Sequence, residues 1–247
     1  MRPLLTFLLA AAVSAPVSAQ SLADRIAKAP DGTVHLAFAA RPGVCGDGRS
    51  IRTDGPDDDD DGGCPCTGTV RASLEVRGGA VTALRVRVGG HWTDSATTDL
   101  GRVAAVDAAD YFLGLAERAS GDVGRRAILP AAIADSAVTW PRLLGIARND
   151  RLDHGRRREA VFWVGQAAGE AATRGLDSLA GSDTADREIR EAAVFALSQR
   201  PKDEGVPILI RIATTNRDPD IRRKAMFWLG QSDDPRALAL FEKILGG

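Results

Sequence analysis

Three segments of this chain repeat one pattern at nearly constant spacing, and this repeat constrains the fold more than any other feature. The copies begin at Asp153, Asp186 and Asp218, which are 33 and 32 residues apart. Each copy has Asp, Arg, Ala, Phe and Gln at matching positions: Asp153/Arg157/Ala160/Phe162/Gln166, Asp186/Arg190/Ala193/Phe195/Gln199 and Asp218/Arg222/Ala225/Phe227/Gln231. A period of this length is typical of helical solenoids, whose stacked helices bury a continuous core.

The third copy continues into a stretch that resembles a HEAT repeat. The residues that carry the resemblance are Asp218, Ile221, Arg222, Ala225, Leu229, Gly230, Pro235, Arg236, Ala237, Leu238, Ile244 and Leu245. It covers roughly residues 120–247 and is closest to the short variety also found in phycobilisome lyases. It implies an α-solenoid that acts mostly as a binding scaffold, in which Asp and Arg side chains link neighbouring repeats.

The spacing predicts where the helices of about four units lie. A first, divergent unit carries Asp122 and Arg126, 31 residues before Asp153, and Pro130 interrupts its pattern. The same spacing predicts a helix over 106–119 and second helices over 140–147, 171–179, 203–213 and 235–245. We expect Asp153, Asp186 and Asp218 to cap helices, with each Arg one turn away.

Small and large apolar residues alternate within each copy. Ala160, Ala193 and Ala225 predict a close approach of two helices, and residues four positions later share the Ala face: Val164, Leu197 and Leu229. We interpret Phe162, Phe195 and Phe227 as core residues between repeats rather than as a ligand-binding stripe. Trp163 and Trp228 are the candidate partner-binding residues, since Trp is favoured at binding hot spots, with packing at the edge of the core as the alternative.

The segment before the repeats predicts a small antiparallel β-rich domain. Alternation places Val34, Leu36 and Phe38 on one face of a strand, and residues 70–76 and 81–88 predict a hairpin around Gly78-Gly79 with a bulge near 83–84. Such a sheet needs something packed on it. We expect it to dock on the first helices and to cover the apolar end of the stack. The fold class is therefore mainly α, with a C-terminal α-solenoid and a small β-rich N-terminal part.

Residues 1–19 have the features of a secretory signal peptide. Arg2 precedes an apolar run over 4–13, and small residues at 17–19 suit cleavage before Gln20. We therefore expect an exported protein, periplasmic or secreted, divided into 1–19 as signal peptide, 20–100 as the β-rich domain and 101–247 as the helical repeats.

The three cysteines of the chain are Cys45, Cys64 and Cys66. Export permits a disulfide, and Cys45 with Cys66 or Cys64 would close a loop of about twenty residues. One cysteine is left over. A closed zinc site would need a further ligand, and a redox motif is more typically C-x-x-C.

An acidic run lies between these cysteines. Asp57, Asp59 and Asp61 with Gly62 resemble the start of a calcium loop, in which alternating carboxylates converge on one cation. The Glu that completes an EF-hand is missing, so the alternatives are a weak calcium site and a solvated acidic loop. No other cofactor is indicated.

Catalytic signatures such as G-x-S-x-G, H-E-x-x-H or a phosphate-binding glycine loop are missing from the sequence, and His91, Trp92 and Asp94 are weak evidence for a site. A net charge of −1 argues against nucleic acid as partner, and no apolar run suits a membrane span. We expect a non-enzymatic, exported scaffold that binds another protein or macromolecule. A cation-binding or redox-active envelope protein using the loop 57–66 is the alternative, and a lyase-like enzyme is the third.

Overall fold

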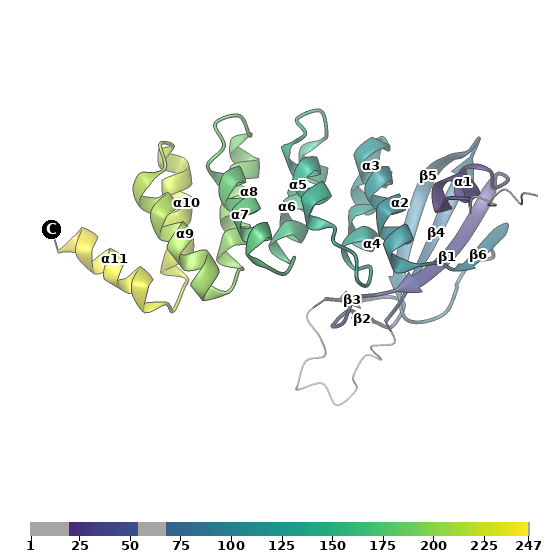
Figure 1. Ribbon diagram of the computed structural model, residues 1–247, viewed down its shortest axis with the longest axis horizontal. Coiled ribbons are helices and arrows are strands. Elements are labelled where there is room, and N and C mark those ends of the chain that lie inside the picture. Colours follow the sequence, from purple (N-terminus) through teal and green to yellow (C-terminus); the bar gives the residue numbers. More distant parts are fainter. Residues whose placement is uncertain (1–19, 54–67, 247) are drawn as a thin grey trace, which may run out of the picture.

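A β-sheet lies at one end of the molecule, and helices extend from it in a row (Figure 1). The structure is a computed structural model that describes residues 20–53 and 68–246. The helical part confirms the expected α-solenoid, and the N-terminal part confirms the expected small sheet. Strand gives way to helix between residues 102 and 105.

The sheet has four strands in the order β5 (Ala80–Val88), β4 (Thr69–Arg77), β1 (Gly32–Ala39) and β6 (Thr98–Arg102). β4 is antiparallel to both of its neighbours, as expected for the hairpin, but β6 runs parallel to β1. The sheet is therefore mixed: the strands expected from the sequence are antiparallel, and the parallel strand β6 was not expected. β6 has the sequence TDLGR, which lacks the apolar alternation that identifies a strand.

One face of the sheet is apolar and completely buried, as the alternation predicted. Its residues are Val34, Leu36, Phe38, Val70, Ala72, Leu74 and Val76. The predicted bulge lies one residue earlier than expected, because Ala83 pairs with Glu75 and Val81 with Val76 while Thr82 is left over. A short helix, α1 (Leu22–Ala27), precedes the sheet, and its N-cap Ser21 accepts a hydrogen bond from the backbone N–H of Asp24 at 3.1 Å. β2 (Cys45–Gly46) and β3 (Ile51–Arg52) form a separate two-stranded ribbon.

The buried face of the sheet packs on the first helices, which are α2 (Ala105–Arg118), α3 (Gly121–Arg126) and α4 (Ile128–Ala132). Phe38 of β1 meets Phe112 of α2 with ring centroids 6.0 Å apart. The buried apolar residues form one cluster that runs from Leu22 to Ala237. The sheet thus closes one end of the helical core, where a solenoid otherwise exposes apolar surface.

The remaining helices, apart from the last one, form antiparallel hairpins. They are α5 (Trp140–Arg148), α6 (His154–Gly165), α7 (Glu170–Ala180), α8 (Arg187–Ser198), α9 (Lys202–Thr215), α10 (Pro219–Gly230) and α11 (Pro235–Leu245). α5 packs most closely on α6, α7 on α8 and α9 on α10. The structural unit is therefore shifted by one helix from the unit that begins at each repeated Asp, because a sequence period gives the spacing of units but not their starting point.

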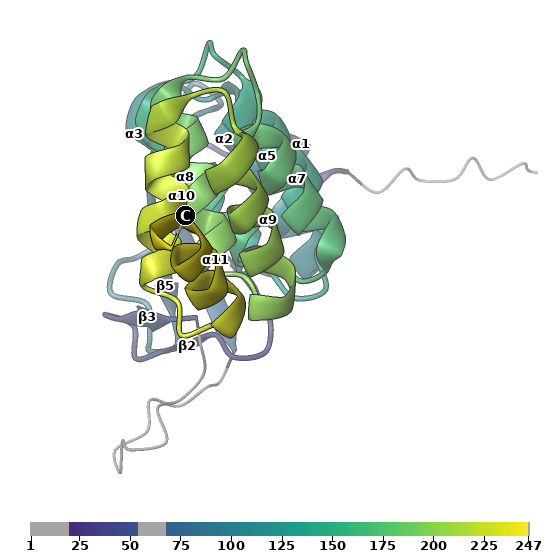
Figure 2. The same cartoon turned by 90° about the vertical axis from the view of Figure 1, so that its left-hand side faces the viewer.

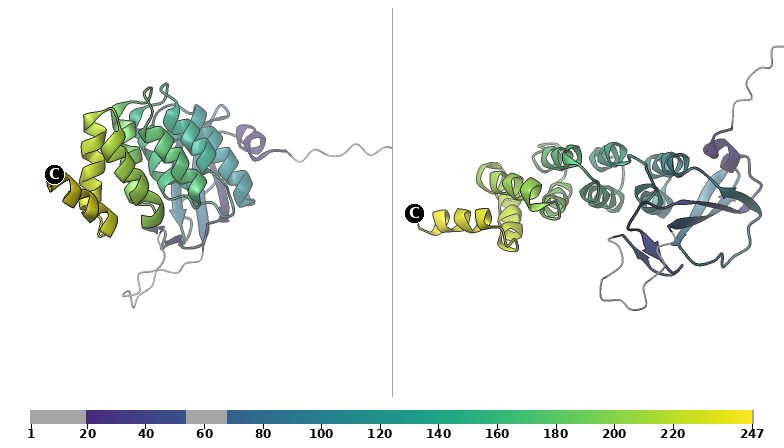
Figure 3. Two further views of the ribbon diagram at one scale, coloured as in Figure 1. Left: turned by 60° about the vertical axis from the view of Figure 1, so that its left-hand side comes forward. Right: turned by 60° about the horizontal axis from the view of Figure 1, so that its bottom comes forward.

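The helices lie in two layers. Seen from the C-terminal end, α8 and α10 lie in one layer and α5, α7 and α9 in the other (Figure 2), and the right panel of Figure 3 shows the two rows of helices nearly end-on. α6 packs on α8, and α8 on α10. The small-residue prediction is confirmed on these helices, since the repeated alanines and the residues four positions later are fully buried: Ala160, Ala193, Ala225, Val164, Leu197 and Leu229.

Repeated Asp and Arg residues link neighbouring repeats, as the HEAT resemblance implied. Arg157 pairs with Asp186, and Arg190 Nη1 donates to Asp218 Oδ2 at 2.8 Å. Each Arg also donates from Nε to the end of the preceding helix, Arg157 to the Ala147 carbonyl at 3.0 Å and Arg190 to the Ala180 carbonyl at 3.3 Å. Each Arg therefore joins its own helix to the end of the preceding helix and to the start of the equivalent helix in the next repeat.

The repeated Asp residues also begin helices. Asp153 Oδ1 accepts from the backbone N–H of Arg156 at 2.9 Å, and Asp218 Oδ1 accepts from that of Asp220 at 2.9 Å. The Asp220 N–H bond, followed by the charge of Arg190, lowers the pKa of the Asp218 carboxyl. Asp186 makes no such cap bond, and its carboxylate is engaged by Arg157 instead.

The first junction uses a different Arg. Arg126 pairs with Asp122 inside its own helix and does not reach the next unit. Arg156, the residue before Arg157, is buried and donates to the carbonyls of Ala116 and Gly121 at 3.1 Å each. Gly124 makes room for it, because a Cβ there would lie 2.4 Å from the Arg156 guanidinium carbon.

Arg157 is buried and links two repeats. Replacing it by Ala should lower the free energy of unfolding by about 2–3 kcal/mol, since Asp186 and the Ala147 carbonyl lose a charged partner. The matched control is Arg126→Ala, which removes the corresponding Arg of the divergent unit, whose ion pair is exposed. Urea unfolding followed by circular dichroism should show a lower midpoint for Arg157→Ala and nearly the wild-type midpoint for Arg126→Ala. Equal midpoints would contradict a stabilising role for the Arg–Asp pairs that link neighbouring repeats.

Candidate partner-binding surface

The repeated Phe residues lie at the surface rather than in the core. Phe162 is 41% exposed and Phe227 is 56% exposed, while Phe195 between them is half-buried. The expectation that these residues fill the core between repeats was therefore wrong. Each Phe follows its buried Ala by two residues, which is about 200° around a helix, so it points away from the Ala face.

Trp163 occupies the core position next to Phe162. It is 5% exposed, its Nε1 donates to Glu159 Oε1 at 3.1 Å, and the guanidinium of Arg41 lies 5.7 Å from its ring centroid. Its ring packs edge-on against Phe162 at 5.2 Å. Trp163 therefore anchors the Arg41 segment of the sheet domain to α6, and its burial favours the alternative of packing at the edge of the core over partner binding.

Trp228 is half-buried, so this candidate remains at the surface. Its ring lies 4.9 Å from Phe195 of the preceding repeat and 5.0 Å from Phe227 beside it. Its Nε1 is buried and has no hydrogen-bond partner among the described residues. We define the aromatic face as Phe162, Phe195, Phe227 and Trp228. These residues lie on α6, α8 and α10, which form one layer of the solenoid.

Two hollows accompany the aromatic face. One has a volume of about 480 Å³ and is lined by Arg158, Glu188, Glu191, Ala192, Phe195, Lys224 and Trp228. The other has a volume of about 340 Å³ and is lined by Arg187, Glu191, Asp220, Arg223, Lys224 and Phe227. They share Glu191 and Lys224, so together they form one open depression between α8 and α10.

The charged side chains around this depression mostly neutralise one another. Glu191 accepts from Arg187 Nε at 3.3 Å and from Lys224 Nζ at 3.4 Å. Asp220 pairs with both Arg187 and Arg223. Arg158 has no ion pair among the described residues. The rim therefore carries little net charge, and exposed aromatic area is its main attraction for a partner.

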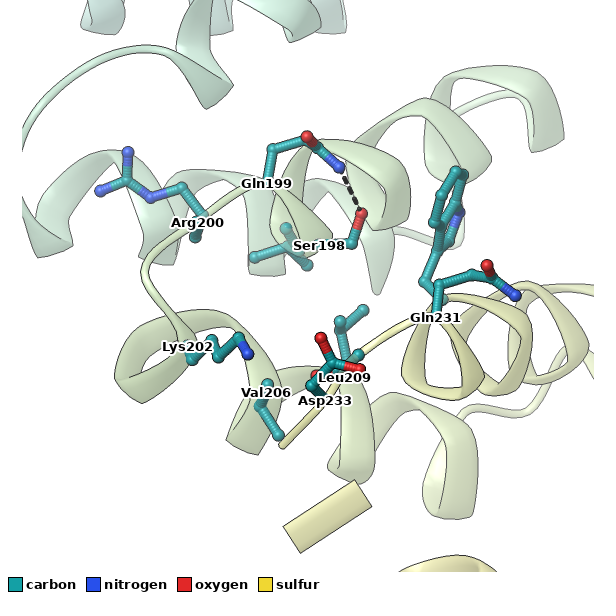
Figure 4. Close-up of a pocket in the computed structure, with 11 residues that line it drawn as sticks. Ser198, Gln199, Arg200, Lys202, Val206, Leu209, Gln231 and Asp233 are labelled. Atoms are coloured by element: carbon teal, nitrogen blue, oxygen red, sulfur yellow. Dashed lines mark hydrogen bonds between the residues drawn. The ribbon is translucent and has the colours of Figure 1, made fainter. Parts of the chain in front are cut away.

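A smaller polar hollow lies on the other side of Trp228 (Figure 4). It has a volume of about 190 Å³, and its lining is Leu197, Ser198, Gln199, Arg200, Lys202, Val206, Leu209, Trp228, Gln231, Ser232 and Asp233. Gln199 donates to Ser198 Oγ at 3.1 Å on one side, and Lys202 and Val206 lie across from them. Trp228 thus separates an aromatic depression from a polar one.

Arg200 makes one wall of the polar hollow rigid. It is buried and donates to the Gly165 carbonyl at 3.1 Å, to Thr173 Oγ1 at 2.8 Å and to Glu204 Oε2 at 2.9 Å. Hydrogen bonds from Thr173 and then from Arg200 lower the pKa of the Glu204 carboxyl. These contacts join α6, α7 and α9 through the loop that follows α8, so the wall is set by the packing of three hairpins.

The predicted metal and disulfide residues lie mostly outside the described part of the chain. Asp57, Asp59, Asp61, Cys64 and Cys66 all fall between residues 54 and 67. Cys45 is fully buried in β2. The calcium site and the Cys45–Cys66 (or Cys64) disulfide therefore remain predictions. Within 20–53 and 68–246 no group of three His, Cys, Asp or Glu side chains is placed to hold a metal.

A polar cluster on the outer face of the sheet includes Trp92 and Asp94. His35 is buried and stacks on Trp92 at 3.8 Å, and its Nε2 lies 3.2 Å from Asp94 Oδ1. Ser73 Oγ donates to Asp94 Oδ2 at 2.7 Å. Both side chains contact Asp94 rather than each other, which is not the arrangement of a catalytic triad. The cluster instead holds the segment between β5 and β6 against the sheet. The sequence around Trp92 and Asp94 did not predict that His35 and Ser73 contact them, because those two residues lie on β1 and β4.

Comparison with protein families gives one match. Residues 176–247 match the family model for HEAT repeats, which covers α8 to α11 and part of α7. No curated protein matches the chain. In the part of the chain that the structure describes, no helix has the length and apolar character required to cross a bilayer.

Three truncations on α8 and α10 should differ in their effect on stability. Leu197 is fully buried, so Leu197→Ala should cost about 2–5 kcal/mol. Phe195→Ala should cost about 1–2 kcal/mol and Phe227→Ala less than about 1 kcal/mol, because Phe195 is only partly buried and Phe227 keeps more than half of its surface in water. Urea midpoints test this order. A cost for Phe227→Ala as large as that for Leu197→Ala would contradict its surface position.

Proposed function

We propose that this protein is a non-enzymatic HEAT-repeat scaffold that holds a protein partner on the aromatic face. The observation that carries the proposal is the exposure of Phe162 and Phe227, which recur at the repeat spacing on one layer of helices. HEAT repeats generally present extended surfaces for protein partners. Exposed aromatic side chains beside a depression are typical anchors of such interfaces.

The layout of the depression supports binding through apolar contact. Trp228 offers a large, half-buried ring beside the exposed ring of Phe227. The ion pairs of Glu191 and Asp220 occupy the nearby cations. A partner would therefore be held mainly by aromatic burial, and its binding would depend only weakly on salt.

The same residues support a scaffold rather than an enzyme. The hollows beside the aromatic face are open depressions lined by paired charges, glutamines and apolar side chains. Catalytic sites more often combine a concave pocket with a few convergent polar groups. The resemblance to lyase-type repeats assigns no residue to the aromatic face, so a lyase-like activity is not part of the proposal.

We also propose that the protein works outside the cytoplasm, on the basis of residues 1–19 alone. If this segment is removed on export, the native protein begins at Gln20. Intact-mass measurement of protein isolated from its own cells tests this. A mature chain that still begins at Met1 would contradict export by this route.

The partner-binding proposal is tested with a variant that removes the two most exposed rings, Phe162→Ala with Phe227→Ala. Both side chains are largely exposed, so the fold should survive, which circular dichroism checks. Wild type and variant are used as bait in affinity capture from the native cells, followed by identification of bound proteins. The double variant should capture at least about tenfold less of the partner than wild type does, as expected for hot-spot residues.

The matched control is Leu238→Ala, which removes an equally exposed apolar side chain on α11, away from the aromatic face. The control should capture the partner as wild type does. Retention of the partner by the double variant, or equal loss in both variants, would overturn the assignment of the aromatic face.

A further inference from the structure

A hollow lies where the sheet meets the solenoid, away from the aromatic face. It has a volume of about 610 Å³ and is bounded by α1, the turn between β4 and β5, α2 and the start of α3, near the top of Figure 1. None of its lining residues lines the hollows beside Trp228. Its volume lies in the range of small-molecule sites.

Much of the wall of this hollow is apolar. Ile26, Val81, Leu115 and Val123 supply its aliphatic side chains, and six of the other ten lining residues are Ala or Gly. Small residues leave space between the elements that larger side chains would fill. An apolar molecule placed here would bury surface against four different elements, and this burial would favour its binding.

Arg118 is the one charged side chain among the residues that line the hollow. It has no ion pair or hydrogen bond with any described residue, whereas its neighbour Glu117 is engaged by Arg142. The guanidinium lies over Gly114 of its own helix, where a Cβ would come within 2.7 Å of Nη2. The glycine therefore allows the cation to lie back against α2 beside the apolar wall.

Tyr111 lines the same hollow one turn before Leu115. Its hydroxyl is protonated at neutral pH and can donate a hydrogen bond, and burial raises the pKa of this phenol further. It has no hydrogen-bond partner among the described residues. The hollow thus combines an apolar wall with one cation and one neutral donor.

We propose that this hollow binds a small amphipathic carboxylate, an acyl chain with one terminal carboxyl group. The chain would lie against Ile26, Val81 and Leu115. The carboxylate would pair with the Arg118 guanidinium, whose fork geometry suits a carboxylate, and would accept from the Tyr111 hydroxyl. A single lining cation matches a monoanion, and a doubly charged phosphate would remain half compensated.

The test uses octanoate as the probe and octanol as its uncharged analogue, each titrated into the full chain below micelle-forming concentrations. Calorimetry should show octanoate binding more tightly than octanol. Amide shifts in NMR should change around Gly79 and Gly114. Replacing Arg118 by Gln should weaken octanoate binding about tenfold and leave octanol binding unchanged, because it removes only the ion pair.

Two further variants separate charge from position. Gly114→Ala keeps the charge of Arg118 but displaces its guanidinium, since the three atoms nearest the new Cβ all belong to the end of that flexible side chain. Ala also favours the helix, so the fold should hold. It should weaken octanoate binding. Arg151→Gln removes an exposed Arg from the loop between α5 and α6 and should change nothing.

Equal affinity for octanoate and octanol, equal loss in Arg118→Gln and Arg151→Gln, or amide shifts confined to the aromatic face would each overturn the proposal. Partner capture by the aromatic face does not involve these residues, so failure here leaves the proposed scaffold function untouched. Thermal unfolding of each variant shows whether a lost affinity reflects a lost fold.

Discussion

A helical stack must bury the apolar surface at its ends, and the rest of this structure depends on how the sheet meets that need. The buried face of β1 and β4 lies against α2, where Phe38 and Phe112 meet, and the buried cluster continues from there through the solenoid. Neither part closes its core alone, because the sheet has one apolar face and the first helices have an uncovered side. Sheet and helices are therefore one cooperative unit around a shared core.

Within the stack, polar side chains determine how successive repeats sit on each other. Arg157 and Arg190 each contact the helix before them and the Asp of the next repeat. Apolar contacts alone are non-directional. The charged bonds have defined geometry, so they select one arrangement of the layers. At the junction with the sheet domain Arg156 takes this role, and it does so where Gly124 leaves space for its guanidinium.

The packing of the helices determines where the aromatic face lies, but it does not require aromatic residues there. The close approach of α6, α8 and α10 requires Ala on the buried side, and a residue two positions later must then point outward. At that outward position a polar side chain would cost nothing, yet Phe occurs in all three copies. The same layer carries Trp228 between an aromatic and a polar hollow. Repetition of an exposed aromatic residue, without a role in the core, is what favours a binding surface here.

The sequence by itself determined the repeated helices, the hairpin with its bulge, the buried alanines and the ladder of Asp and Arg, because these depend on short-range periodicity and on a family pattern. Only the tertiary structure decided the pairing of helices into hairpins, the parallel position of β6, and which aromatic residues are exposed. Adjacent positions such as Phe162 and Trp163 have the same hydrophobic character, so composition cannot say which one faces the core. That choice depends on the neighbouring elements, since Arg41 and Glu159 hold the indole inward and leave the phenyl ring at the surface.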